Sequence, residues 1–398
     1  MTSADRTPSR GPAYLGTSHL SRHRARRAQP SGQPWLGLAG LAYVIPFGVL
    51  FAVVLGGPER TTLVLGPITT AATPAIATIV LWWEDWPGTS LRAGWSGLTD
   101  TLLIAAAAVV LTGFTQVVVN GWDLRGVFLA TPGPGHAVTY PVTMALAGTA
   151  LSAMLQLTFV TEGWPLRGRR RLSRVWAGLI AFGIAWVVAL AAWALVVSPG
   201  PIGDVSLQTY GMWLIILGAW QVVLFAVLPG RPFTLIRNRA ARLITANVAI
   251  VVLTEITYAL MRGLGVENSV IGAIGGVVVG AGLVMAVLFD GWPGTRIGGV
   301  TGDIVMLAIT AALAAALYGV LAAVGSGLHL GRVSMTGWIT LASLNWVGMV
   351  VLLHAAVWSR WPVIAQPASS TPEPAALDPG RDDHLAAELS VPDHGTRS

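Results

Sequence analysis

The 398-residue chain contains no cysteine, and its 24 basic residues are all arginine because lysine is absent as well. Without cysteine the protein has no disulfide, no thiolate metal site and no thiol nucleophile. Without lysine it cannot form a Schiff base, which excludes retinal-type chromophores and lysine nucleophiles. Hydrolase and metalloprotease signatures such as G-x-S-x-G and H-E-x-x-H are also missing. The sequence therefore predicts no enzyme, no metal site and no cofactor.

Charge is scarce too, since 11% of the residues are charged whereas 54% are hydrophobic and the mean hydropathy is +0.67. Soluble globular domains carry about a quarter charged residues. Apolar stretches of about 20 residues, the length that a helix needs to cross the hydrocarbon core, recur along nearly the whole chain. We therefore expect an all-α, polytopic membrane protein whose first partner is the lipid bilayer. Binding to nucleic acid is not expected.

The composition divides the chain into three regions. Residues 1–35 form a basic N-terminal arm, 36–362 a transmembrane domain, and 363–398 an acidic C-terminal tail. Both ends are rich in proline, serine, glycine and charge, so we expect them to be disordered. Arginines cluster in the arm just before the first apolar stretch, which most simply orients the protein and contacts anionic lipid.

Ten candidate spans follow from the apolar stretches. Their approximate ranges are 36–56, 63–83, 99–119, 138–160, 175–197, 210–228, 242–262, 268–289, 303–324 and 335–358. If the N-terminus is cytoplasmic, every arginine lies on the cytoplasmic side except Arg60, Arg125, Arg262 and Arg332. Because arginine and lysine are retained on the cytoplasmic side of inner membranes, we expect a plasma (inner) membrane protein with both termini in the cytoplasm.

A short phrase recurs along the chain, as "EDWPGT" at 84–89 and "DGWPGT" at 290–295. Trp-Pro pairs stand at the ends of four even-numbered spans, and Arg231-Pro232 is a weaker copy after the sixth; the pairs are Trp86-Pro87, Trp164-Pro165, Trp292-Pro293 and Trp361-Pro362. A repeat of this length predicts five helical hairpins with their Trp-Pro turns on the cytoplasmic side. Tryptophan anchors a helix at the headgroup layer and proline ends it, which we favour over a catalytic role.

Acidic residues follow or flank these turns. Asp100 and Asp303 stand near the starts of the next spans, where a carboxylate caps the unpaired N–H groups of a helix. Capping therefore explains both residues. A less favoured alternative is that they join Glu84, Asp85, Glu162 and Asp290 in a ring that attracts cations at a cytoplasmic mouth.

Glu255 is the one carboxylate well inside a span, and an ionised carboxylate costs several kcal/mol in lipid. With 100° between successive residues, one face of the seventh span carries a polar stripe formed by Asn247, Thr254, Glu255, Tyr258 and Arg262. Gln221 and Asn345 are possible partners from other spans. This pattern predicts a substrate or proton path, whereas the alternative is a hydrogen-bonded packing residue.

Gly272, Gly276 and Gly280 form two consecutive small-xxx-small steps that favour close helix packing. The neighbouring helix belongs either to the same chain or to a second copy, which leaves a homo-oligomer open.

The function that these features favour is a permease or transporter of a small molecule or ion, with proton coupling through Glu255 as one option. The alternative is a non-transporting membrane scaffold or a subunit of a membrane complex, because so little inside the spans is polar.

Overall fold

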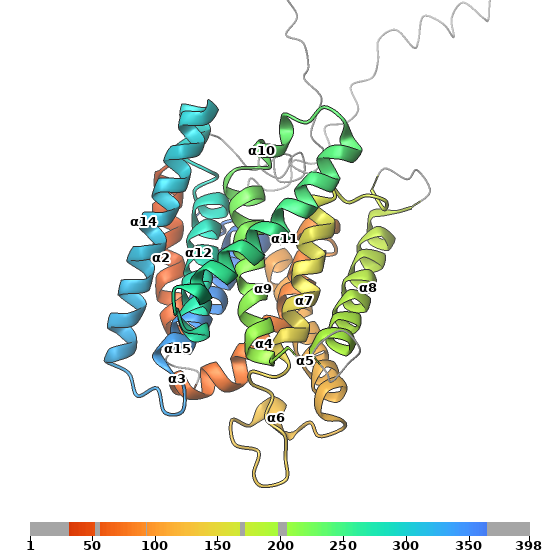
Figure 1. Cartoon of the computed structure of the whole chain (residues 1–398), viewed down its shortest axis with the longest axis vertical. Helices are drawn as coiled ribbons and strands as arrows, with labels where there is room; N and C mark the ends of the chain where they lie inside the picture. The colour runs from red at the N-terminus through yellow and green to blue at the C-terminus, as the bar shows by residue number, and fades with distance from the viewer. Residues whose placement is uncertain (1–31, 52–55, 93, 168–171, 198–204, 364–398) are drawn as a thin grey trace, which may run out of the picture.

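The computed structural model describes residues 32–51, 56–92, 94–167, 172–197 and 205–363 (Figure 1). Nearly all of the expected arm and tail lies outside these ranges. The described chain is helical and contains no β-strand, only an isolated bridge between Gly126 and Val138. The expected all-α class is therefore confirmed.

Eight helices in the described ranges are long and apolar enough to cross a membrane. They are Gly57–Trp82, Trp95–Asn120, Arg174–Val197, Leu207–Val227, Arg239–Gly263, Asn268–Leu288, Gly299–Ser326 and Met335–Val357. Two further apolar helices, Trp35–Val49 and Met144–Val160, are shorter. The protein is thus a multi-pass integral membrane protein, and the count of ten spans stays a prediction.

The helix of the expected fourth span begins at Met144 rather than near residue 138. Val138 takes part in the isolated bridge, and Pro141 follows Tyr140. Proline has no N–H to donate and disfavours helical geometry at the residue before it. The segment before Met144 is therefore a folded loop and not an additional helical turn.

The helices form two layers. The inner layer consists of α4 (Gly66–Ala77), α7 (Met144–Leu155), α9 (Leu207–Gln221), α12 (Asn268–Leu283) and the stretch Met335–Val357, which includes α15 (Met335–Leu341), η10 (Ala342–Gly348), α16 (Met349–Leu352) and η11 (Leu353–Val357). Each of these packs against the next, and η10 packs against α4. Within the described residues the inner helices therefore close a ring.

The outer layer consists of α2 (Trp35–Val49), α5 (Trp95–Asn120), α8 (Arg174–Ala192), α11 (Arg239–Gly263) and α14 (Gly299–Ser326). Along the chain, outer and inner helices alternate. α5 packs on α4, α8 on α7, α11 on α9, α14 on α12, and α2 on η10 and α16. Figure 1 shows α14 and α8 on opposite flanks of the bundle, with α11 running obliquely across the front. Each of α5, α8, α11 and α14 thus covers the inner helix that precedes it, and α2 covers the last inner stretch.

Glycines allow the inner helices to approach closely. A Cβ atom on Gly276 would meet Ser343 Oγ at 2.7 Å and the Thr340 carbonyl oxygen at 3.2 Å, and one on Gly280 would meet the Ser343 carbonyl oxygen at 3.0 Å. A Cβ on Gly272 would collide with Met212 of α9. The structure therefore places this glycine ridge against neighbours within the same chain.

The five inner helices of the described chain end in the same way. Each finishes in a π-helical turn: η4 (Thr78–Trp82), η6 (Gln156–Val160), η8 (Val222–Val227), η9 (Val284–Leu288) and η11. In each, the next residue donates its N–H to the carbonyl five residues back, and the residue two further on donates to the carbonyl six back; Trp83 N to Thr78 O and Asp85 N to Ile79 O, both at 2.9 Å, are one example. Two residues with positive φ then precede the Trp-Pro or Arg-Pro pair.

The second positive-φ position explains part of the sequence repeat. Glycine adopts this backbone conformation without the strain that a side chain adds. Three turns place glycine there, namely Gly163, Gly230 and Gly291, whereas the other two place Asp85 and Arg360, with φ of 63° and 64°. Both exceptions are buried. At Arg360, hydrogen bonds to Asp290 and to the carbonyl oxygens of Val287 and Leu288 offset this strain.

Each turn also bonds to a residue near the start of an outer helix. In every case this is the second outer helix after the turn, if the count continues from α14 to α2 around the ring. The contacts are Glu84 with Arg174, Glu162 with Arg239, Arg231 with Asp303, Asp290 with Gln33, and Trp358 with Thr101. In the described chain the five turns thus share their backbone hydrogen bonds and the arrangement of their partners.

Asp100 and Asp303 do not cap their own helices, so that expectation was wrong. α5 begins at Trp95 and α14 at Gly299, which puts both carboxylates beyond the first helical turn. The buried Asp100 instead accepts the N–H of Gly88 at 3.2 Å and fixes the preceding turn. Asp303 pairs with Arg231 at 3.1 Å.

Candidate functional site: a cavity inside the inner ring

A cavity of about 570 Å³ lies inside the inner ring and is lined by residues from all its helices. At the end with the turns, called the turn end from here on, the lining includes Leu81, Phe159, Ala226, Asp290 and Arg360. At the opposite end it includes Tyr140, Gln208, Ser269 and Ser334. The lining therefore extends along the whole length of the inner helices. Its volume lies within the range of small-molecule sites, about 300–1,000 Å³.

Glycines keep part of this space open. Gly211 and Gly218 lie seven residues apart on one face of α9, and Gly148 lies on α7. A Cβ atom on Gly211 or Gly218 would meet nothing within 4 Å, and one on Gly148 would meet only Leu214, at 3.9 Å. Backbone forms the wall at these three points, so a larger side chain there would project into the cavity.

A chain of side-chain amides runs from the cavity wall to the outer layer. Gln221 Nε2 donates to Gln156 Oε1 at 2.8 Å and to the Ser152 carbonyl oxygen at 3.0 Å. Gln156 Nε2 donates to Asn247 Oδ1 at 2.8 Å, and Asn247 Nδ2 donates to the carbonyl oxygen of Leu243 at 2.7 Å. Each amide thus donates to the next residue in the order Gln221, Gln156, Asn247 and Leu243, so the chain has one direction.

A second polar group of the lining lies on α4 and the last inner stretch. Asn345 Nδ2 donates to the Gly66 carbonyl oxygen at 3.2 Å and to Thr70 Oγ1 at 3.4 Å. The hydroxyls of Thr70 and Thr73 donate to carbonyl oxygens of their own helix. The hydrogens of these lining residues are therefore occupied, while hydroxyl oxygens remain able to accept.

Charge is confined to the turn end of the lining. Arg360 Nη2 donates to Asp290 Oδ2 at 2.8 Å and to the carbonyl oxygens of Val287 and Leu288 at 2.9 and 3.2 Å. Gln33 Nε2 also donates to Asp290 Oδ2, at 2.9 Å. Among the lining residues of the described chain, only Arg360 and Asp290 are charged, and they form an ion pair with each other.

Arg167 connects the turns of the first two inner helices close to the cavity. Its Nη2 donates to the carbonyl oxygen of Leu81 at 2.6 Å, and its guanidinium stacks 4.5 Å from the centre of the Trp82 ring. Burial lowers the pKa of Arg167 to about 10, against the opposing effect of the Glu84 carboxylate. A pKa of about 10 leaves the guanidinium charged at neutral pH, where it acts as a hydrogen-bond donor and a cation–π partner.

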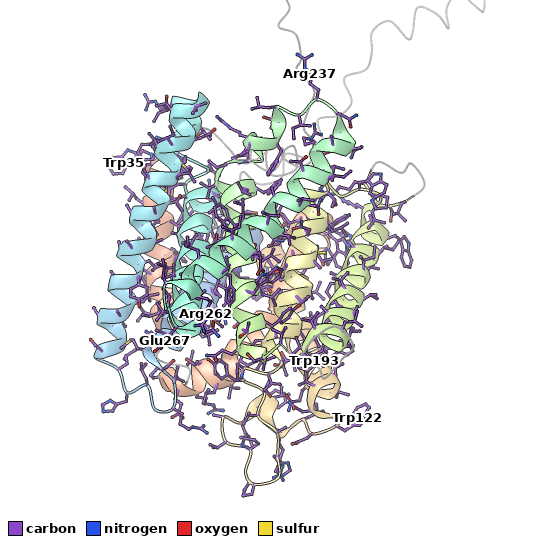
Figure 2. The ribbon with its side chains drawn as sticks, viewed as in Figure 1. Trp35, Trp122, Trp193, Arg237, Arg262 and Glu267 are labelled. Carbon is purple, nitrogen blue, oxygen red and sulfur yellow. The ribbon has the colours of Figure 1, made fainter. Side chains whose placement is uncertain are left out.

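The polar stripe expected on the seventh span does not form a connected path. Glu255 is exposed on α11, and its Oε2 accepts from Trp213 Nε1 at 3.0 Å. Thr254 bonds a carbonyl of its own helix, Tyr258 bonds Asn268, and Arg262 bonds the carbonyl oxygen of Val266. Figure 2 shows Arg262 on α11 at the front of the bundle.

Of the seven residues expected on the path, Gln221 and Asn345 line the cavity. Asn247 reaches it indirectly through the amide chain. The remaining four, Glu255, Thr254, Tyr258 and Arg262, do not belong to the lining. The coupling role of Glu255 stays a prediction, and Glu255 does not line the cavity.

Two features of the site were missed from the sequence. The spacing of Gly211 and Gly218 by seven residues places them on one helical face, a signal that could have been found. Arg360 stands where three of the other four turns have glycine, which becomes visible only when the five turns are aligned.

Comparisons with protein-family models, with curated proteins and with solved structures find no match to this chain. Its class is therefore defined by the fold alone: a multi-pass, all-helical integral membrane protein. The described part holds a closed inner ring of helices with a cavity inside it.

Proposed function

We propose that the protein is a permease for a small solute and that the solute passes along the inner ring through the cavity. The observation that carries the proposal is the lining, to which all the inner helices contribute from one end of the ring to the other. Ligand sites of membrane bundles lie between helices in this way. The cavity-lining glycines support it further, because each keeps the cavity wide where a side chain would narrow it.

The alternative of a non-transporting scaffold explains the two layers of helices but not the cavity. Helices that serve only to make a rigid bundle gain stability from close packing, and a void weakens such a bundle because the atoms around it have fewer partners for dispersion attraction. Gly211 and Gly218 leave space unpacked inside the ring, since a Cβ atom at either position would meet nothing within 4 Å. A permease gives these positions a purpose.

The solute that fits best is small and uncharged. Most of the lining is aliphatic, and its two charged residues neutralise each other in an ion pair at the turn end. Moving an isolated charge into such surroundings costs several kcal/mol. Hydroxyl and amide groups along the wall instead match a polar, neutral molecule.

We propose that the five turns face the cytoplasm and that the membrane is the plasma (inner) membrane. In the described chain the arginines at the turn end are Arg92, Arg167, Arg174, Arg231, Arg237, Arg239, Arg242, Arg296 and Arg360, and those at the opposite end are Arg60, Arg125, Arg262 and Arg332. Figure 2 shows Arg237 and Trp122 at opposite ends of the bundle. Arginine excess on one side favours the cytoplasmic assignment of that side.

Urea and glycerol uptake into proteoliposomes tests the proposal, with Gly218→Trp as the blocking variant. The indole would project from α9 into the cavity, so we expect uptake to fall at least about tenfold, which is about 1.4 kcal/mol in the barrier. Gly183→Trp is the matched control, because Gly183 is exposed on α8 and a Cβ there also meets nothing within 4 Å. Equal uptake by both variants, or no uptake by the unmodified protein, would contradict the proposal.

A further inference from the structure

We propose that Gln221 is the central binding residue of the cavity and that it accepts a hydrogen bond from an N–H or O–H group of the solute. This inference rests on the proposed function and narrows its substrate class to neutral hydrogen-bond donors. It is carried by the amide chain, by the bonding of four other polar lining residues, and by the space beside Gln221.

The amide chain leaves one group of Gln221 without a partner. Both donors of its Nε2 are used, on Gln156 and on the Ser152 carbonyl, whereas its Oε1 receives no hydrogen bond from any described residue. Gln221 is 2% exposed. Leaving a buried carbonyl oxygen unpaired is costly. If the oxygen and nitrogen of this amide were exchanged, its oxygen would face Gln156 Oε1 and the Ser152 carbonyl oxygen, which are both acceptors. The hydrogen bonds therefore fix which atom of the amide is the oxygen.

Four other polar lining residues, Thr70, Thr73, Thr340 and Asn345, share this bias toward acceptors. Thr70 and Thr73 give their hydroxyl hydrogens to helix carbonyls, as Thr340 does to the carbonyl of Thr336 at 2.7 Å. Asn345 directs its Nδ2 at Gly66 and Thr70. A solute that carries donors therefore finds partners on several inner helices. A solute that carries only acceptors finds no free donor on these four residues.

Space for the solute lies next to Gln221. Gly218 precedes Gln221 by about one helical turn on α9, and Gly148 precedes Ser152 by about one turn on α7. Each glycine thus clears the wall beside a polar residue on the same helical face. α12 contributes Val279 and Leu283 to the lining. The site combines an accepting amide, open space and an apolar surface, as expected for a small amphipathic molecule.

Urea and nitrate are suitable probes because both are small and planar, while urea carries four N–H donors and nitrate carries only acceptors and a charge. We expect the unmodified protein in proteoliposomes to take up urea at least about tenfold faster than nitrate. Gln221→Met keeps the length of the side chain and removes the acceptor. It should reduce the urea-to-nitrate ratio about fivefold, the effect of one hydrogen bond of about 1 kcal/mol.

Gln116→Met is the matched control. Gln116 is a buried glutamine on α5 that bonds Asp123 and Ala137 and lies outside the cavity lining. Its replacement should leave the ratio unchanged, and an equal drop in both variants would mean that loss of a buried amide acts through stability, which overturns the inference.

The failure of this inference can be distinguished from failure of the proposed function. If Gly218→Trp blocks urea uptake while Gln221→Met leaves the urea-to-nitrate ratio unchanged, the path stands and the role of Gln221 is refuted. If nitrate enters faster than urea through the unmodified protein, the donor class is refuted. If neither probe enters, both proposals fail.

Discussion

The inner and outer layers are built from similarly apolar helices but bury them very differently. In the apolar core of Met335–Val357, 72% of the residues are buried, compared with 17% in Gly299–Ser326, the outer helix that precedes it in the chain. The inner helices also end in π-helical turns, whereas α5, α11 and α14 are uninterrupted α-helices. Hydrophobicity therefore does not distinguish a helix that faces lipid from one that faces protein.

The outer and inner helices have different packing requirements. An outer helix needs only a lipid-compatible surface, because the bilayer satisfies apolar side chains without specific packing. An inner helix must fit two inner neighbours, an outer helix and the cavity at once, which requires glycines at defined positions such as Gly276 and Gly218. Substitutions should therefore be costly in the inner layer and tolerated in the outer one.

The largest effect is expected at the ion pair of the inner layer. Arg360→Leu removes the buried guanidinium, which leaves Asp290 with Gln33 as its remaining partner and the carbonyls of Val287 and Leu288 without this donor, so the free energy of unfolding should fall by about 3 kcal/mol. Denaturant unfolding in detergent measures it. Arg296→Leu, at an exposed position in a nearby turn, should change the value by less than about 0.5 kcal/mol. Equal losses of stability in the two variants would contradict the claim that the ion pair of the inner layer matters more than an exposed arginine.

Glycine substitutions compare the layers directly. Gly276→Leu should lower the free energy of unfolding by about 1–3 kcal/mol, because its side chain would overlap Ser343 and Thr340. Gly319→Leu is the outer counterpart on α14, where a Cβ meets nothing within 4 Å. It should raise stability by up to about 1 kcal/mol, since leucine forms helix better than glycine. A loss at Gly319 as large as that at Gly276 would contradict this account.

The long loop 121–143 opposite the turn end gives a pH-dependent prediction. The Ala137 N–H, followed by the Arg125 N–H and His136, holds the pKa of Asp123 below its usual value. A lowered folded pKa contributes stability that is present above the unfolded pKa, about 3.9, and lost as the pH falls through the folded pKa. Hydrogen exchange in the loop, corrected for its intrinsic pH dependence, should therefore accelerate only below about pH 4. Asp123→Asn should show the accelerated rate at pH 7, and slow exchange in that variant would refute the role of Asp123.

The smallest effect is expected at Glu255 of the outer layer. Glu255→Gln keeps an acceptor for Trp213 Nε1 and changes no residue of the cavity. We therefore expect urea uptake to stay within about twofold of the unmodified protein, less than the effect of one hydrogen bond. A strong loss of uptake would return Glu255 to the transport path and support proton coupling through it.

The sequence predicted what composition and repetition can encode. Low charge and long apolar stretches indicated a helical membrane protein, and the described chain is helical with eight helices long enough to span a membrane. The five hairpins with cytoplasmic Trp-Pro turns stay a prediction. These signals are local, since each depends on residues that are neighbours in the chain. The packing of the helices against one another depends instead on residues that are far apart in the chain.

The candidate site was predicted less well for the same reason. A buried acid in a span is a strong sequence signal, but nothing local shows that Glu255 lies on an outer helix beside Trp213. The cavity depends instead on residues such as Gly148 and Gly218, which mark it by having no side chain. Gln221 was expected only as a partner, and its position in the wall follows from the closure of the ring.

The central claim is that the proposed solute path runs inside the inner ring and not along the outer layer. Because the chain has no native cysteine, Gly218→Cys and Gly183→Cys each place one thiol near the middle of an inner and an outer helix. A membrane-impermeant thiosulfonate should modify the cysteine at 218 and leave that at 183 unmodified. Modification at 183 with none at 218 would contradict the account.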